Sequence, residues 1–271
     1  MLDEYQGHGR VVGGSRAEAM DAAHRAWLDA RADGRSVVVM APDHATVDQL
    51  ALRARATRVA AGEVEEAGVV ASRQVVGVGD EVVTTMNDRR LVTSAGGWVR
   101  NGDRWQVLAR RPDDSLLLSS LDGRGKVTVP GRYVKDNVAL AYAVTVHKGQ
   151  GLTTDRAVLL VDGATTAEHL YVGLTRGREH NLACVACEPF DDGHRHQPAP
   201  STQDVLGAAL RRSGNETSAT EAGRAGLASA EQPGIVAGAL AQAVRRQAVA
   251  HYPVRATVPP VAEMSGAGPD L

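Results

Sequence analysis

A polar, glycine-containing segment occupies residues 141 to 155, where the sequence reads AYAVTVHKGQGLTTD. Four of its side chains carry groups that can contact a phosphate: Thr145, His147, Lys148 and Gln150. Gly149 and Gly151 have no β-carbon, so a ligand can come close to their backbone. The pattern predicts a segment that binds the phosphate of a nucleotide or of a nucleic acid. The alternative is a turn in which the glycines allow close packing and the polar side chains are only solvated.

A second segment, LYVGLTRGR at residues 170 to 178, follows it closely and contributes Arg176 and Arg178. Two arginines at this spacing supply positive charge at the end of an expected helix. The alternative interpretation is a pair of solvated arginines, since a cation near the last turn of a helix interacts favourably with the helix dipole.

Cys184 and Cys187 form a C-x-x-C pattern within LACVACE. No glycine or proline supplies a turn between them, and in an extended strand positions three apart point to opposite faces. We therefore expect buried strand cysteines and no bound metal.

The sequence lacks a phosphate-binding loop of the form G-x-x-x-x-G-K-[ST]. The segment GRGKV at residues 123 to 127 has neither the upstream glycine spacing nor the following Ser or Thr. The chain therefore has no sequence for cradling the phosphates of ATP by itself.

Together, AYAVTVHKGQGLTTD and LYVGLTRGR resemble motifs V and VI of superfamily 1 helicases of the RecD-like branch. The resemblance is greatest to the helicase half of conjugative relaxases of the MobF or TraA type. In that family motif V follows a small SH3-type barrel inserted into the second RecA-like lobe, where this chain has GDEVVTTMNDRR and WVRNGDRWQVL. EAMDAAHRAWLDA and VVVMAPDHATVDQLALRARA resemble the start of that lobe, around motif IV, and DVLGAALRRSG resembles the segment that trails the helicase.

The resemblance implies an ATP-dependent DNA helicase, in which ATP and Mg²⁺ lie between two lobes. Arg176 takes the role of the arginine finger, an interaction that accelerates hydrolysis on the order of 10³- to 10⁵-fold. Arg178, its neighbour, is the second catalytic candidate, and the alternative is that it only pairs with Glu179 or with the tail. Gly151 and, by a loose alignment to motif IV, Arg53 and Arg55 are the nucleotide-binding candidates. Asp162 follows motif V, so it is interpreted as a turn residue at a strand end.

Single-stranded DNA is the implied partner. Motif V would contact its sugar-phosphate backbone through Thr145, His147, Lys148 and Gln150. Residues 86 to 135 hold ten Arg and Lys against five Asp, so the barrel is basic and offers Arg89, Arg100 and Arg104 as further DNA contacts. Trp98 and Trp105 could stack on bases, but in a small barrel we expect them in the core.

The expected fold is α/β: a RecA-like lobe without a P-loop, an inserted SH3-like β-barrel and a largely disordered, partly helical tail. Residues 1–76 begin the lobe, 77–137 form the barrel, 138–188 complete the lobe, and 189–271 are the tail, with helical patches at DVLGAALRRS and GIVAGALAQAVRRQAVAHY. Within the lobe we expect a helix from a Ser15–Glu18 capping box, a buried strand at 36–41 and a helix at about 45–61. A strand at 157–161, a helix from a Thr165–Glu168 capping box and a closing strand NLACVAC follow.

The 271 residues carry a net charge of −2, which excludes a polybasic coat, and no apolar run approaches the roughly 20 residues of a membrane span. A cytoplasmic protein without membrane contact is the default. Motifs I, Ia, II and III would precede residue 1, so we expect the second half of a motor that holds no nucleotide alone and is supplied with a first lobe by a separate chain. A non-catalytic module that binds single-stranded nucleic acid through the basic barrel is the alternative, and a gene remnant without selected activity is a third.

Overall fold

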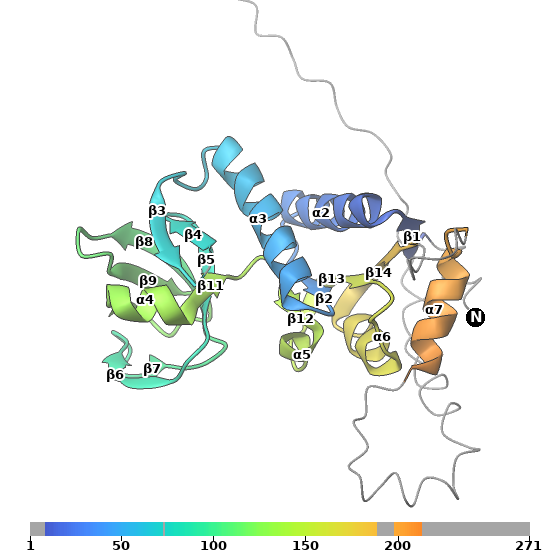
Figure 1. Ribbon diagram of the computed structural model, residues 1–271. Coiled ribbons are helices and arrows are strands. Elements are labelled where there is room, and N and C mark those ends of the chain that lie inside the picture. Colours follow the sequence, from blue (N-terminus) through green and yellow to red (C-terminus); the bar gives the residue numbers. More distant parts are fainter. Residues whose placement is uncertain (1–8, 73, 189–197, 213–271) are drawn as a thin grey trace, which may run out of the picture.

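The computed structural model describes residues 9–72, 74–188 and 198–212, and it contains a parallel sheet with helices on both faces beside a separate antiparallel β unit (Figure 1). The parallel sheet has the strand order β1-β14-β13-β2-β12. Its strands are β1 (Val11–Gly14), β2 (Val37–Ala41), β12 (Val144–Thr145), β13 (Thr154–Val161) and β14 (Gly177–Ala186). A parallel sheet covered by helices is the α/β architecture that the resemblance to a RecA-like lobe predicted. We call this sheet and its helices the lobe.

Alternating apolar side chains give the lobe a core on each face of its sheet. In β2, Val39 packs into one core and Met40 into the other. The helices α2 (Arg16–Ala32) and α3 (His44–Ala60) cover the Val39 face. The Met40 face is covered by α6 (Ala167–Gly173), by α7 (Thr202–Arg211) and by the single turn α5 (Val146–Gly149). Every strand of the sheet centre is therefore buried on both sides, which explains its continuous apolar sequence.

The first helices begin and end where the sequence indicated. Ser15 caps α2, and the Ser15 and Glu18 side chains form both hydrogen bonds of the predicted capping box. Asp43 caps α3, which ends just before Gly62, a residue with a φ of +72°. Glycine suits that left-handed position because a side chain there would be strained.

The second predicted capping box is wrong by one residue. Thr166, and not Thr165, caps α6 by accepting a hydrogen bond from the His169 amide. Thr165 is fully buried and bonds instead to Asp162, whose amide donates to the Thr165 hydroxyl at 3.0 Å. Asp162 also accepts from the Ala164 amide at 2.9 Å, so its interpretation as a turn residue at the end of β13 is confirmed.

Part of the predicted tail packs on the lobe. Helix α7 begins with a Ser201–Asp204 capping box, and Val205, Leu206 and Ala209 are buried against the Met40 face of the sheet. The second predicted tail helix, GIVAGALAQAVRRQAVAHY, lies outside the described residues.

Residues 68–140 make up the β unit. Five strands form an antiparallel sheet in the order β10-β9-β8-β5-β11: β5 (Glu81–Thr84), β8 (Arg104–Arg110), β9 (Leu116–Ser120), β10 (Lys126–Val129) and β11 (Val138–Leu140). Two separate hairpins and a helix complete it: β3 (Gly68–Ala71) with β4 (Gln74–Gly77), β6 (Asp88–Val92) with β7 (Trp98–Val99), and α4 (Gly131–Asn137). Since β10 and β11 are the edges of this sheet, closure into an SH3-like barrel and the domain limits at 77 and 137 stay predictions.

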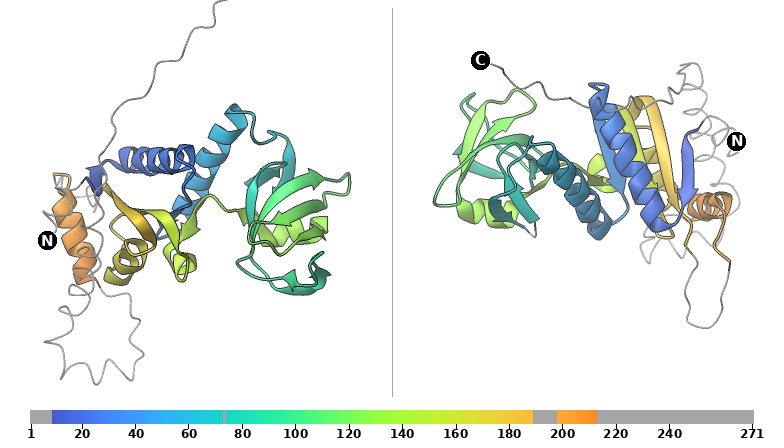
Figure 2. Two further views of the ribbon diagram at one scale, coloured as in Figure 1. Left: turned by 180° about the vertical axis from the view of Figure 1, so that it is seen from behind. Right: turned by 90° about the horizontal axis from the view of Figure 1, so that it is seen from above.

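Figure 2 shows, from behind and from above, that the β unit lies beside the lobe and leaves both faces of the parallel sheet to the helices. The apolar core on the Val39 face continues without a break into the β unit, where it includes Trp105 and Leu118. The lobe and the β unit are therefore joined by shared packing as well as by the chain.

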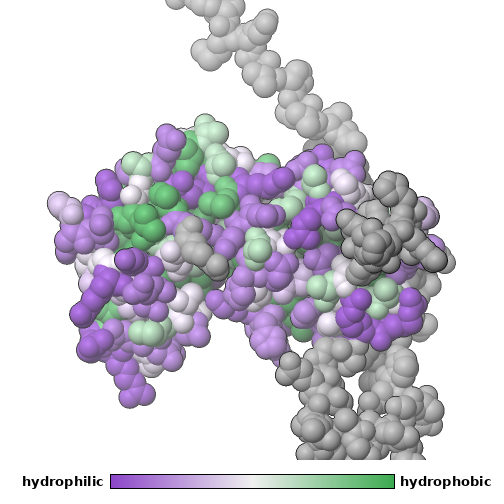
Figure 3. Space-filling model, in the orientation of Figure 1, coloured by the Kyte–Doolittle hydropathy of each residue, from purple (hydrophilic) through white to green (hydrophobic). Residues whose placement is uncertain are grey.

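The β3–β4 hairpin exposes Val70 and Val75, and Figure 3 shows an apolar area over this part of the β unit.

The prediction of buried strand cysteines is confirmed for Cys184 and wrong for Cys187. Cys184 is fully buried in β14 on the Val39 side of the sheet, and Cys187 just beyond the strand is half-buried on the Met40 side. Across residues 9–72, 74–188 and 198–212, no cluster of three or more His, Cys, Asp or Glu side chains is arranged as a metal site. None of the helices in this part of the chain combines the length and the apolarity needed to span a bilayer.

Candidate nucleotide and nucleic-acid site

The motif V segment forms the turn α5 between β12 and β13. Thr145 is its N-cap, and the Thr145 hydroxyl accepts a 3.4 Å hydrogen bond from the Lys148 amide. Thr145 is only 8% exposed, whereas His147, Lys148 and Gln150 are exposed. Three of the four predicted DNA-contacting side chains therefore face solvent, and Thr145 shapes the turn beneath them.

The two glycines of this segment are required for different reasons. A β-carbon at Gly149 would lie 2.6 Å from the Sδ atom of Met40, so glycine lets α5 pack directly on β2. Gly151 has a φ of +85°, and no atom lies within 4 Å of the position its β-carbon would take. The predicted close approach of a ligand is therefore wrong for Gly149, because Met40 occupies the space beside it. The open backbone on the solvent side is at Gly151.

Arg176 lies in the connection from α6 to β14, beside the end of the motif V segment. Its Nε donates to the Val172 carbonyl at 3.0 Å, and its two terminal nitrogens approach the Thr175 hydroxyl at 2.8 Å and the Leu152 carbonyl at 3.5 Å. The Arg176 carbonyl in turn accepts from the Thr154 amide at 3.0 Å. No carboxylate forms an ion pair with Arg176 among the residues that the structure describes. The structure therefore brings Arg176 and the motif V segment together and leaves the guanidinium charge without a counter-ion there.

Arg178 has a partner other than the expected one. Its guanidinium lies 3.6 Å from Asp155, whereas Glu179 pairs with Arg35 at 3.0 Å. Ser36 donates to Asp155 from its amide at 2.9 Å and from its hydroxyl at 2.7 Å, and these bonds lower the pKa of Asp155. The predicted pairing of Arg178 with Glu179 is wrong because the β14 backbone turns the two side chains toward different neighbours.

The motif IV arginines are both engaged within the protein. Arg53 pairs with Asp21 of α2. Arg55 donates to the buried carboxylate of Asp80 at 2.8 Å and to the carbonyls of Glu65 and Glu66 at 2.8 and 3.0 Å. Arg55 therefore fastens α3 to the start of the β unit. No hydrogen bond or ion pair in the described ranges joins either arginine to Arg176, so their nucleotide contact stays a prediction.

Of the three β-unit arginines predicted to contact DNA, one forms an ion pair and two lie over an aromatic ring. Arg104 pairs with Glu81 at 3.2 Å, at the boundary with the lobe. The guanidinium carbons of Arg89 and Arg100 lie 5.5 and 5.1 Å from the ring centre of Trp98.

The two tryptophans of the β unit differ in burial. Trp105 is fully buried and its Nε1 donates to the Thr84 hydroxyl at 3.3 Å, so its prediction as a core residue is confirmed. For Trp98 the same prediction is wrong: the side chain is half-buried and outside the core clusters, because the next residue of β7, the fully buried Val99, takes the core-facing position and Trp98 points to the other side.

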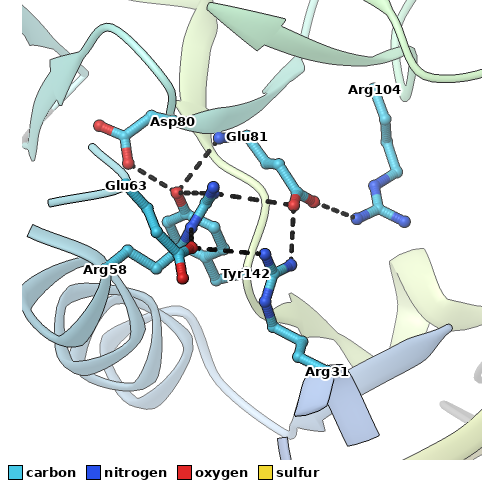
Figure 4. A network of polar contacts seen from close by, with 7 residues as sticks. All are labelled: Arg31, Arg58, Glu63, Asp80, Glu81, Arg104 and Tyr142. Atoms are coloured by element: carbon cyan, nitrogen blue, oxygen red, sulfur yellow. Dashed lines mark hydrogen bonds and ion pairs between the residues drawn. The ribbon is translucent and has the colours of Figure 1, made fainter. Parts of the chain in front are cut away.

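A polar network at the boundary of lobe and β unit had no signal in the sequence (Figure 4). The Tyr142 hydroxyl donates to Asp80 at 2.7 Å and accepts from Arg58 at 2.9 Å and from the Glu81 amide at 3.2 Å. The Glu81 carboxylate is shared by three arginines, at 3.0, 3.8 and 3.2 Å: Arg31, Arg58 and Arg104. Burial and the Asp80 carboxylate raise the pKa of Tyr142 far above its usual value, so the hydroxyl remains protonated. Tyr142 lies within the motif V segment, three residues before Thr145, which places this network next to the candidate site.

His169 of α6 is a second residue that the motifs did not indicate. Its Nδ1 is buried and lacks a hydrogen-bond partner among the described residues. Burial lowers the pKa of His169, and the nearby imidazole of His147 on α5 lowers it further. The two histidines therefore lie close enough to influence each other electrostatically, one on the helix that precedes Arg176 and the other on the motif V turn.

Comparison with known proteins gives relatives by sequence and similar solved structures. No known protein-family profile matches the chain. It is similar to conjugal transfer protein TraA of Agrobacterium fabrum, with 28% identity over 191 residues that cover 69% of this chain and 17% of TraA. It is 27% identical over 184 residues to a probable TraA of Sinorhizobium fredii, covering 66% of this chain and 16% of that protein. An uncharacterized protein of Mycobacterium tuberculosis is 32% identical over 98 residues, 36% of this chain and 56% of its own length.

The chain thus spans less than a fifth of the TraA proteins and about half of the mycobacterial protein. Among solved structures, Bacteroides Pif1 bound to single-stranded DNA has a TM-score of 0.41 and 20% identity, over 56% of this chain and 41% of Pif1. Pif1 helicase from Candida albicans has a TM-score of 0.33 and 15% identity, over 56% and 45% of the two chains. The relatives by sequence confirm the resemblance to TraA-type proteins that the two motifs indicated.

Proposed function

We propose that this chain acts as the second RecA-like lobe of a relaxase-type, ATP-dependent DNA helicase. The observation that carries the proposal is the position of Arg176, which joins the motif V segment through Leu152 and Thr154 and has no acidic partner in the described structure. A guanidinium with three neutral acceptors keeps its full charge for the γ-phosphate of a nucleotide presented by another lobe. Its longest hydrogen bond, 3.5 Å to the Leu152 carbonyl, is the one most easily exchanged for such a ligand.

Single-stranded DNA is the proposed partner of the motif V turn. His147, Lys148 and Gln150 are exposed on one short turn whose shape is set by Thr145, so they can contact consecutive phosphates. In the β unit, Arg89 and Arg100 add positive charge, whereas Arg104 is held by Glu81 and contributes less. We assign the β unit to the inserted SH3-like domain of this family.

ATP and Mg²⁺ would be held mainly by the first lobe, because the chain has no P-loop sequence. From this chain, Arg176 would face the nucleotide across the cleft, and the open backbone at Gly151 would border it. The chain alone therefore should not hydrolyse ATP.

Two measurements on the purified chain test the proposal. Fluorescence anisotropy with a labelled 12-residue oligothymidylate should show salt-dependent binding that Lys148→Ala weakens, with Arg25→Ala, on the exposed side of α2, as the charge-matched control. Phosphate release from Mg²⁺-ATP should stay at background with and without the oligonucleotide. DNA-stimulated release that Arg176→Ala abolishes would show that the chain is a complete motor and that the two-lobe proposal is wrong.

A second candidate function is a non-catalytic module that binds single-stranded nucleic acid through the β unit. The two arginines beside Trp98 favour it, since neither has a carboxylate partner in the described part of the chain. Binding that is lost on Arg89→Ala and Arg100→Ala but unchanged by Lys148→Ala would favour this module over the helicase lobe.

A further inference from the structure

Trp98 belongs to the β6–β7 hairpin, which is not part of the five-stranded sheet of the β unit. Strand β6 pairs only with β7 among the described strands, and Trp98 lies opposite Val92. In Figure 1 this hairpin lies at the lower edge of the β unit, on the same side of the molecule as α5. Figure 3, in the same orientation, shows mostly hydrophilic residues at this end. The next residue, Val99, is fully buried in the core, so the alternation along β7 turns Trp98 away from the core.

Charge around the ring is the second observation. Arg90 is neutralised by Asp88 through two hydrogen bonds of 3.0 Å, from its Nε and its Nη2. Arg89 and Arg100 lie beside Trp98 instead, and within the described residues neither guanidinium has a carboxylate or a hydrogen-bond acceptor. Two uncompensated cations therefore flank one aromatic ring.

Exposure of the ring is the third observation. Trp27 and Trp105 are buried, at 4% and 0% exposure, and the Trp105 N–H is satisfied by Thr84. Trp98 is the tryptophan with open surface, and its indole N–H makes no hydrogen bond to any described residue. Its polar edge is open to a ligand, whereas the guanidiniums of Arg89 and Arg100 lie over the ring, so a stacking base would displace them from the ring.

We propose that Trp98, with Arg89 and Arg100, forms a stacking site for one base of a single-stranded nucleic acid. The ring would stack on the base, and each guanidinium would contact a phosphate on either side of it, which is how aromatic and basic side chains hold single strands without reading sequence. This inference rests on the proposed function and adds a base-contacting residue to it. Single strands are favoured over duplexes, because a paired base has both faces covered by its neighbours.

Intrinsic fluorescence gives a direct test, because two of the three tryptophans are shielded. Unlabelled oligothymidylate of 12 residues should quench the emission of the wild-type chain and protect it from iodide, and Trp98→Phe should remove both effects. Anisotropy should show that Trp98→Ala weakens binding about fivefold or more, the effect expected from losing one base–aromatic contact. Arg89→Ala and Arg100→Ala should each reduce the slope of log affinity against log salt by about one. Oligouridylate should bind as oligothymidylate does, since stacking does not distinguish the sugars.

The controls separate this inference from the proposed function. Arg90→Ala, on the same hairpin but paired with Asp88, should change the affinity less than Arg89→Ala. Absence of any wild-type binding at low salt would reject DNA binding altogether. Binding that depends on Lys148 but not on Trp98, without quenching, would overturn the stacking site and leave the helicase lobe intact. Equal quenching by a 12-base-pair duplex would also overturn it, and if Trp98→Ala does not fold, the iodide protection of the wild-type chain still decides.

Discussion

The Tyr142 hydroxyl donates a 2.7 Å hydrogen bond to the Asp80 carboxylate and thereby ties the motif V segment to the residue that precedes β5 of the β unit (Figure 4). The two residues are 62 positions apart in the chain. Asp80 is fully buried and also accepts from Arg55 and from the Gly77 amide, so its charge is stabilised at three points. The β unit is therefore held to the lobe by directional bonds as well as by apolar packing.

Tyr142→Phe should lower the free energy of unfolding by ~1–3 kcal/mol, because it leaves Arg58 and the Glu81 amide without their shared acceptor in a buried setting. Urea unfolding followed by circular dichroism measures this loss. Tyr171→Phe is the matched control, since Tyr171 is 41% exposed and should change stability by less than about 0.5 kcal/mol. Equal stability of the two variants would show that the Tyr142 hydroxyl contributes nothing to holding the β unit.

Local sequence signals were enough to predict the parts of the lobe that depend on nearest neighbours. The Ser15–Glu18 capping box lies within one turn, and the apolar run of β2 reflects burial on both faces. Thr165 and Thr166 are equally good caps by sequence, and the choice is made by Asp162, which binds Thr165 from the end of β13.

Contacts between distant residues explain what the sequence did not reveal at the site. The sequence predicts a nucleotide contact for Arg55 and a DNA contact for Arg104, but the buried carboxylate of Asp80 and the shared carboxylate of Glu81 hold these two side chains. Trp98 was expected in the core because aromatic side chains of small barrels usually lie there, but in β7 the neighbouring Val99 takes the buried position and leaves Trp98 half-exposed. Pairings of this kind have no periodicity in sequence, so motif and pattern cannot indicate them.

Gly149→Ala should destabilise the chain by ~1–3 kcal/mol, because the new methyl group would lie 2.6 Å from the Sδ atom of the fully buried Met40. Gly207→Ala is the control within α7: its nearest atom is the flexible end of Arg211 at 3.3 Å, and alanine favours a helix interior by ~0.5–1 kcal/mol over glycine. Thermal unfolding of both variants checks the prediction. A Gly149→Ala chain as stable as Gly207→Ala would mean that α5 does not need its close packing on β2.

The two cysteines should differ in reactivity. Burial raises the pKa of the Cys184 thiol to about 12, so almost no thiolate forms at neutral pH, whereas Cys187 is half-buried at the surface of the same sheet. Titration of the native chain with a thiol-reactive dye should label Cys187 first, and unfolding in urea should release the second thiol. Cys187→Ser should remove the native reaction, and rapid labelling of that variant would place Cys184 in a more open sheet than the structure has.

Stability should fall as the pH is lowered from 7 toward 5, and His180 of β14 should account for part of this change. Burial lowers the pKa of His180 below its usual value of 6.5, and the neighbouring charges of Arg10 and Arg156 lower it further. The unfolded chain therefore takes up a proton at a pH where folded His180 stays neutral, which favours unfolding. The free energy of unfolding is thus unaffected by His180 above pH 6.5 and decreases as the pH falls from 6.5 toward the lower pKa of the folded state.

Urea unfolding of the wild-type chain and of His180→Gln between pH 7.5 and 5 measures this contribution. The variant should show a shallower decline in the free energy of unfolding below pH 6.5, because glutamine takes up no proton in either state. His44→Gln, at an exposed position in the first turn of α3, is the control and should keep the wild-type slope. A steeper decline in His180→Gln than in the wild type would mean that folded His180 gains a proton more readily than the unfolded chain, opposite to what its position beside two arginines requires.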